Sequence, residues 1–182
     1  MTFTYLSKDQ LLPPSQQVMK LLSLSEKHPK ASYKEDAAAL IKKYSAEKLF
    51  VPDENLGKNV LHYAISTNNP MIAIDLINKA GVTSEQLFHN DTYNFTPLHE
   101  AIDKDKILVA RELIRKATTS GQLQCETHVH DDHKTAMQMA EDKSMTDVVR
   151  DLKKRIKDLS ANARQKKLPP RYRTNQQSAL GI

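Results

Sequence analysis

The sequence predicts an all-α protein built from repeated pairs of short helices, and three observations indicate this fold class. A nine-residue pattern at Gly57–Ile65 recurs at Asn94–Ile102, and a more divergent version occurs at His133–Glu141. The leucine of its Leu-His pair recurs after 37 residues, and Met137 follows after 39 more. In step with this pattern, three segments contain Leu-Ile: 39–43, 75–79 and 112–116. Aromatic residues make up only 5% of the chain, Trp is absent and there are 4 Gly, so helix packing is favoured over a turn-rich β fold.

Each repeat is predicted to contain two short helices. In the middle repeat Thr96 is a suitable helix cap and Pro97 a suitable first residue, and Leu98, Ala101 and Ile102 then lie on one face. The second helix is expected to bury a further apolar stripe, which consists of Ile107, Val109, Ala110, Leu113 and Ile114. A single helix pair cannot bury both faces, so the pairs must stack.

The chain is predicted to have three parts. Residues 1–52 are a helical cap or degenerate repeat, with helices at Pro14–His28 and Ser32–Tyr44, and residues 53–159 are the repeats. Residues 160–182 are expected to form a disordered basic tail. In the long connections, Leu49-Phe50 and Leu87-Phe88 are expected to pack down from an extra helical turn.

The net charge of +5 is concentrated near the C-terminus. The stretch from Arg150 to Arg173 has ten basic and two acidic residues, a net charge of +8, so the residues before it carry −3. Nucleic-acid binding by the repeats is therefore not expected, whereas the tail is a candidate for contact with anionic membrane or nucleic acid. No transmembrane segment and no signal peptide are expected. The single cysteine, Cys125, excludes an internal disulfide and fits a reducing compartment.

The segment Asp91–Ile102 resembles the signature of the ankyrin repeat family, in which a turn precedes Thr-Pro-Leu-His and an Ala-rich first helix. The resemblance covers about residues 53–157, as three units of an ankyrin-like solenoid. Asn59-Val60 replaces Thr-Pro in the first unit, and Ala136-Met-Gln138 replaces Pro-Leu-His in the third. The spacings also exceed the period of about 33 residues that is usual for the family.

The resemblance implies structural roles for four motif residues. His62 and His99 are expected to bond the backbone and the motif threonine, and so to tie neighbouring turns together; Thr96 and Pro97 belong to the same motif. Asn94 stands where the family usually has glycine, and asparagine tolerates a positive φ.

The resemblance also implies that partners contact the turn tips and the exposed positions of the first helices. The corresponding residues are Leu56, Lys58, Ser66, Thr67, Thr92, Tyr93, Phe95, Asp103, Lys104, Asp131, Asp132, Lys134, Asp142 and Lys143. The two aromatic residues among them are candidate anchors. The alternative is that they pack between neighbouring turns.

The segment from Cys125 to His133 is the candidate site for other chemistry. His128, His130 and His133 lie near carboxylates and are candidate metal ligands, and Cys125 is a candidate nucleophile. The alternative is a polar loop, because no second ligand cluster completes a closed site. We therefore expect no metal site, no cofactor and no catalytic residue.

These observations predict a non-catalytic protein-protein interaction module, an adaptor or scaffold that binds a partner through its turn tips and concave face. We expect a cytoplasmic monomer or, if the chain is a bacterial effector, delivery into a host cell. The alternatives are a metal- or thiol-dependent activity at the loop from Cys125 to His133, and binding of anionic membrane or nucleic acid by the basic tail.

Overall fold

A computed structural model describes residues 12–28, 32–128 and 133–167, and the regular elements in these ranges are helices. The longer helices form four pairs: α1 (Pro14–Lys27) with α2 (Tyr33–Lys43), α4 (Val60–Ser66) with α5 (Pro70–Ile77), α7 (Pro97–Asp103) with α8 (Ile107–Lys116), and α9 (Ala136–Asp142) with α10 (Thr146–Lys167). The described residues contain no strand, and an isolated β-bridge joins Glu126 to Thr135. The prediction of an all-α fold is confirmed.

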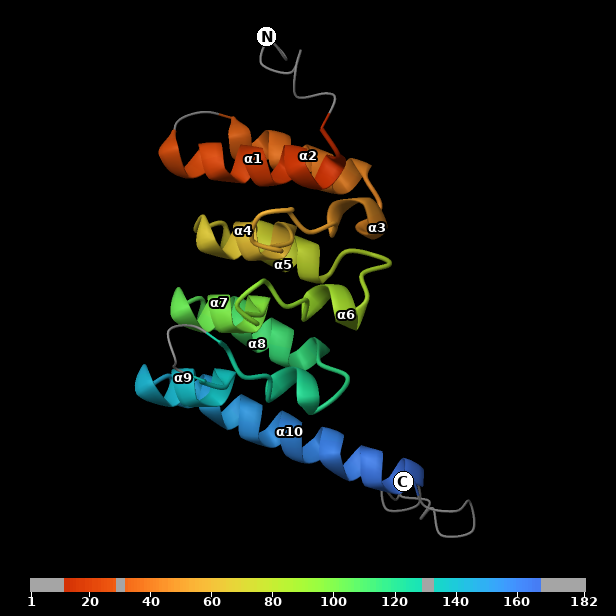
Figure 1. The fold of residues 1–182 in the computed structure, drawn as a ribbon, viewed down its shortest axis with the longest axis vertical. Coiled ribbons are helices and arrows are strands. Elements are labelled where there is room, and N and C mark those ends of the chain that lie inside the picture. The colour runs from red at the N-terminus through yellow and green to blue at the C-terminus, as the bar shows by residue number, and fades with distance from the viewer. Residues whose placement is uncertain (1–11, 29–31, 129–132, 168–182) are drawn as a thin grey trace, which may run out of the picture.

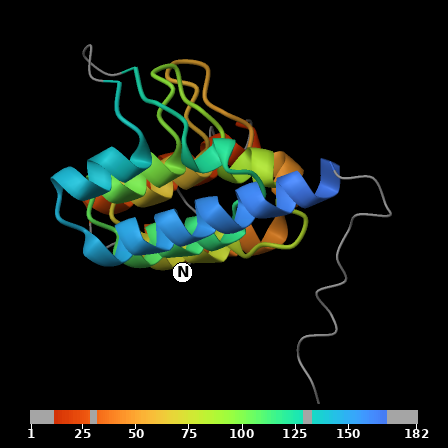
Figure 2. The same ribbon diagram turned by 90° about the horizontal axis from the view of Figure 1, so that it is seen from below.

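The helix pairs lie one above another in chain order (Figure 1). The first helices contact each other in the order α1, α4, α7, α9, and the second helices contact each other in the order α5, α8, α10. Two layers result, and the loops that lead into α4, α7 and α9 project on the side away from α10 (Figure 2). A single apolar core runs between the layers from α1 to α10.

The N-terminal helix pair agrees with the prediction from the sequence. Val18 and Leu22 of α1 are fully buried, and Ala37 and Ile41 of α2 are buried with them. This pair lies against α4, so it covers the apolar side that the next pair would otherwise expose.

Short helical turns in the connections also agree with the prediction. These turns are α3 (Ala46–Leu49), α6 (Ser84–Leu87) and the 3-10 turn η2 (Gly121–Leu123). Their apolar residues are buried: Leu49, Phe50, Leu87, Phe88 and Leu123. Each connection therefore adds buried side chains to the core.

The turn between the two helices has the same backbone geometry in three of the pairs. Its central residue has a positive φ: 56° at Asn68, 55° at Asp105 and 55° at Ser144. The next amide donates to a carbonyl of the first helix in each case: Asn69 to Ala64 (2.9 Å), Lys106 to Ala101 (2.7 Å) and Met145 to Ala140 (2.9 Å). These turns are 37 and 39 residues apart, as are the sequence motifs.

One predicted core residue lies outside the core. Ile107 is 44% exposed, whereas Val109 and Leu113 of the same helix are fully buried. Each residue of an α-helix advances by about 100°, which puts Ile107 at the edge of the buried stripe. The prediction that Ile107 belongs to the core is wrong.

The last helix continues beyond the boundary predicted at residue 160. Helix α10 ends at Lys167 and shows no break at Ser160. Val148 and Leu152 anchor its first half in the core, while residues 161–166 are exposed. Ala, Arg, Gln and Lys have high helix propensity, so the helix propagates past its last core contact. The rest of the predicted tail, 168–182, lies outside the described residues. No described helix has the length and apolar character that crossing a membrane requires.

The repeated positive φ gives a test of this turn geometry. Ser144→Gly is expected to raise the free energy of unfolding by about 0.5–1 kcal/mol, because glycine adopts the left-handed conformation without steric cost. Ser120→Gly is the matched control, since Ser120 has φ −65° and ψ −30°. This substitution is expected to lower the same free energy by about 0.5 kcal/mol. Urea denaturation measures both, and destabilisation by Ser144→Gly would contradict the described turn.

Candidate interaction surface

Helix α7 begins with a capping box in which His99 takes part. The Thr96 hydroxyl donates to Nδ1 of His99 (2.8 Å), and the His99 amide donates to Oγ1 of Thr96 (3.4 Å). The other ring nitrogen, Nε2, lies 3.1 Å from the Cys125 carbonyl oxygen. A carbonyl oxygen accepts hydrogen bonds, so Nε2 carries the proton. His99 therefore joins the start of α7 to the connection that leads to α9, and Pro97 is the buried first residue of the helix.

Helix α4 begins in the same way, with asparagine in place of threonine. The His62 amide donates to Oδ1 of Asn59 (3.3 Å), and Nε2 of His62 donates to the Phe95 carbonyl (3.0 Å). In α9 the box is made by Thr135 and Gln138, whose Oε1 accepts from the Thr135 amide (2.8 Å). The departures from the repeat pattern in the first and third units thus preserve the helix cap.

Burial keeps both histidines neutral. It lowers the pKa of His62 to about 3 and the pKa of His99 to about 4, and the bonds to the Phe95 and Cys125 carbonyls offset only part of this effect. A neutral, buried imidazole held by both nitrogens acts here as a structural crosslink between helix pairs.

The turn before α7 is organised by a buried carboxylate. Oδ1 of Asp91 accepts hydrogen bonds from the amides of Tyr93 and Phe95, both at 2.9 Å. Asn94 has a φ of 56°, in agreement with its place in the turn. Asp53 has the same role before α4, where its Oδ1 accepts from the Leu56 amide (2.7 Å).

Backbone hydrogen bonds also join the successive turn tips. The Thr92 amide donates to the Leu56 carbonyl (3.0 Å), and the His128 amide donates to the Tyr93 carbonyl (2.8 Å). Leu56 and Tyr93 are 37 residues apart, so they occupy equivalent positions in neighbouring turns. The turn tips therefore form a continuous ladder beside the first helices.

A groove of about 550 Å³ lies between this ladder and helices α7 and α9. Nine of the predicted partner-binding residues line it: Leu56, Lys58, Tyr93, Phe95, Asp103, Lys104, Lys134, Asp142 and Lys143. The groove is thus shared by residues from all three predicted units.

The remaining predicted partner-binding residues do not line this groove. Thr67 is buried and its hydroxyl donates to the Tyr63 carbonyl (2.6 Å), so the prediction that Thr67 is accessible is wrong. The Ser66 hydroxyl donates to the same carbonyl (3.3 Å). Thr92 is exposed at the turn tip. Asp131 and Asp132 lie outside the described residues.

Tyr93 and Phe95 have different environments. Tyr93 is 51% exposed. Phe95 is half-buried, and its ring centroid lies 5.4 Å from that of His99. Tyr93 is therefore available to a partner, whereas Phe95 contributes to the packing of the turn as well as to the groove wall.

The groove also contains residues that the sequence analysis missed. These are Asp91, Glu100, Thr127 and Met139. Glu100 and Met139 are 39 residues apart, the same step as the motifs, and Tyr63 precedes Glu100 by 37. Extending the repeat register to this helix position would have identified both residues.

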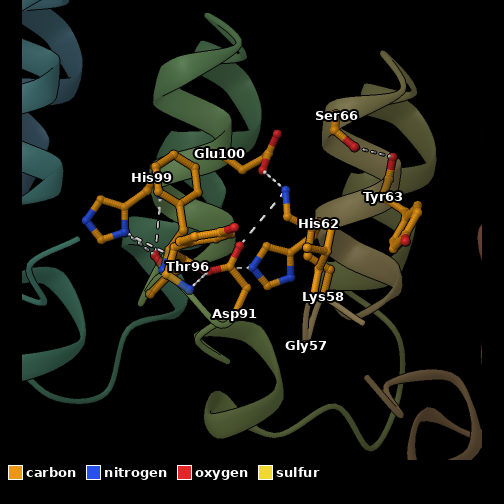
Figure 3. Close-up of polar contacts among 12 residues, drawn as sticks. Gly57, Lys58, His62, Tyr63, Ser66, Asp91, Thr96, His99 and Glu100 are labelled. Atoms are coloured by element: carbon orange, nitrogen blue, oxygen red, sulfur yellow. Dashed lines mark hydrogen bonds and ion pairs between the residues drawn. The ribbon is translucent and has the colours of Figure 1, made fainter. Parts of the chain in front are cut away.

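A largely buried ion-pair cluster is formed by three of the groove residues, Lys58, Asp91 and Glu100 (Figure 3). Nζ of Lys58 is 3.0 Å from Oε2 of Glu100 and 4.0 Å from Oδ2 of Asp91. The two carboxylate side chains are only 5% and 2% exposed, whereas that of Lys58 is 22% exposed. This cluster joins α7 to the segment before α4, and it is shielded from water far more than a surface ion pair.

Other groove residues form exposed ion pairs. They join Lys104 to Asp103 (3.0 Å), Lys134 to Asp142 (3.0 Å) and Lys143 to Asp105 (3.1 Å). Exposed pairs contribute about 0–1 kcal/mol to stability. These pairs therefore contribute little to the stability of the fold.

Comparisons with known proteins do not assign the chain to a family. No family model matches it, and neither a curated protein nor a solved structure matches it.

The described residues of the segment from Cys125 to His133 bear on the alternative of metal or thiol chemistry. Burial raises the pKa of the Cys125 thiol, which opposes formation of the nucleophilic thiolate. His128 and His133 are near neighbours, with ring centroids 5.2 Å apart. Within 12–28, 32–128 and 133–167 no group of three His, Cys, Asp or Glu is arranged to hold a metal ion. His130 lies outside these ranges.

The neutral histidines predict an acid-sensitive fold. Above pH 6.5 His62 and His99 are neutral in the folded and in the unfolded chain. Below this pH the two histidines bind protons in the unfolded chain, whereas in the folded chain they stay neutral until the pH approaches their lowered pKa values. The free energy of unfolding is therefore expected to fall by about 1 kcal/mol per pH unit for each histidine, from pH 6.5 toward pH 4. Urea denaturation between pH 7.5 and pH 4.5 measures this loss.

His99→Gln is the diagnostic variant, because Gln138 occupies the equivalent position in α9. It is expected to lower the free energy of unfolding by about 1–2 kcal/mol at pH 7.5, since the bond to Cys125 is lost. It should also remove the contribution of one histidine, about 1 kcal/mol per pH unit, from the pH dependence of the free energy of unfolding. A variant that keeps the full pH dependence would show that His99 does not titrate as described.

Proposed function

We propose that the chain is a non-catalytic, ankyrin-like interaction module, an adaptor or scaffold, and that it binds a segment of a partner protein in the groove beside the turn tips. The observation that carries this proposal is the groove itself, because it combines exposed apolar side chains with charges contributed by successive helix pairs.

The repeated geometry supports the ankyrin-like part of the proposal. Capping boxes at Asn59, Thr96 and Thr135 occur at steps of 37 and 39 residues. The positive-φ turns between paired helices follow the same steps. A backbone that repeats in this way places side chains from consecutive units side by side on one surface, which suits an extended partner.

The chemistry of the groove supports a protein partner. Leu56 and Tyr93 are 40% and 51% exposed at equivalent turn positions, and Met139 contributes further apolar surface. Charged pairs surround these side chains. Exposed apolar anchors inside a polar rim are typical of protein-protein interfaces. The volume of the groove is within the range of pockets that hold small ligands. The groove can therefore hold a few side chains of a partner but not a whole domain.

Selection of peptides tests the proposal. A displayed library of random 12-residue peptides is selected against the whole chain, and the affinity of the enriched peptides is measured by fluorescence anisotropy. Tyr93→Ala is expected to weaken their binding by about tenfold or more, because an aromatic anchor in an interface commonly contributes 1–2 kcal/mol or more.

Leu108→Ala is the matched control. Leu108 is 73% exposed on α8, in the second-helix layer. Its substitution is expected to leave peptide binding unchanged, and thermal unfolding verifies that both variants fold. The proposal is wrong if no peptide is enriched, or if Leu108→Ala weakens binding as much as Tyr93→Ala does.

A further inference from the structure

The carboxylate of Glu100 has an unused acceptor in the groove. One oxygen, Oε2, accepts from Nζ of Lys58 at 3.0 Å. The other oxygen points away from Lys58 (Figure 3), and it has no hydrogen-bond partner among the residues that the structure describes. Glu100 is only 4% exposed, so this oxygen has little access to bulk water. Because Glu100 lines the groove, a ligand there is the natural source of a second donor.

The buried cluster around Glu100 also carries an excess of negative charge. Asp91 and Glu100 contribute two carboxylates, and Lys58 is the cation that both of them contact. Asp103 at the neighbouring rim is paired with Lys104. One positive charge from outside would balance the cluster, and a buried charge gains most from such a partner.

Aromatic side chains in the same groove restrict which cation fits. The exposed ring of Tyr93 lines the same groove, as does the half-buried ring of Phe95. A guanidinium group stacks on aromatic rings and donates to carboxylates through several N–H groups. A metal ion is disfavoured, because the ammonium group of Lys58 already lies 3.0 Å from the carboxylate.

The repeat register gives the groove a direction. Tyr63, Glu100 and Met139 occupy equivalent positions on α4, α7 and α9. The acidic residue is therefore followed, one unit along, by an apolar residue that also lines the groove.

We propose that the groove recognises a protein segment with an arginine next to an apolar residue, and this proposal rests on the function proposed above. The guanidinium group donates to the open oxygen of Glu100 and stacks beside Tyr93. The apolar side chain lies toward Met139. Glu100 is thus the residue that selects the charge of the partner.

The same peptide selection tests this proposal. The enriched peptides are expected to share an arginine with an apolar neighbour. Replacing that arginine by citrulline, which has a similar shape and no charge, is expected to weaken binding to the native chain by about 10- to 100-fold. This comparison needs no variant of the protein, so it does not depend on the folding of a mutant.

Glu100→Gln is the corresponding protein variant, and it is expected to bind the arginine and citrulline peptides equally well. Glu112→Gln is the control, because Glu112 is a carboxylate on α8 that pairs with Arg115 and does not line the groove. It should keep the preference for arginine, as the native chain does.

The outcomes separate the two proposals. Enriched peptides that require Tyr93 but show no excess of arginine, or a Glu100→Gln variant that still prefers arginine, would overturn the inference and leave the interaction module standing. Enrichment of no peptide at all would overturn both.

Discussion

Hydrogen bonds from two buried histidines to carbonyls of the following turns crosslink neighbouring helix pairs of the stack. Helices α4, α7 and α9 have seven residues each, and helices shorter than about 12 residues are marginal in water. Their stability must come from contacts with the neighbouring pairs. His62 and His99 provide such contacts at a fixed distance, because each imidazole bonds its own helix cap through one nitrogen and the next turn through the other.

The position of the groove follows from these bonds. The Phe95 and Cys125 carbonyls, which accept from the two histidines, lie in the segments that lead into α7 and α9. These bonds also hold the turn tips in place. The amides of Thr92 and His128 then donate to carbonyls of the preceding turns and so join the tips to each other. The groove lies between these tips and the first helices, so the crosslinks hold the backbone on both sides of it.

Much of this arrangement could be predicted from the sequence. The features that were predicted wrongly or not at all have physical reasons. Thr96-Pro97 predicted the start of α7 because helix caps depend on local residues. Thr67 was expected to be accessible, but its hydroxyl folds back onto a helix carbonyl, which residue type alone does not show. The end of α10 was placed too early, because helix propensity can extend a helix beyond its last buried residue. The ion pair of Glu100 with Lys58 joins residues 42 apart in the sequence and depends on tertiary contact.

The same repetition that stabilises the stack allows its groove to vary. Each unit has a cap, a positive-φ turn and a buried stripe, and the cap is an asparagine at Asn59 and a threonine at Thr96 and Thr135. The position after the motif histidine on the first helix varies in residue type. It is a phenol at Tyr63, a carboxylate at Glu100 and a thioether at Met139. Glu100 and Met139 line the groove, so under the proposed function the residues that differ between units, and not the shared motif residues, would distinguish one partner from another.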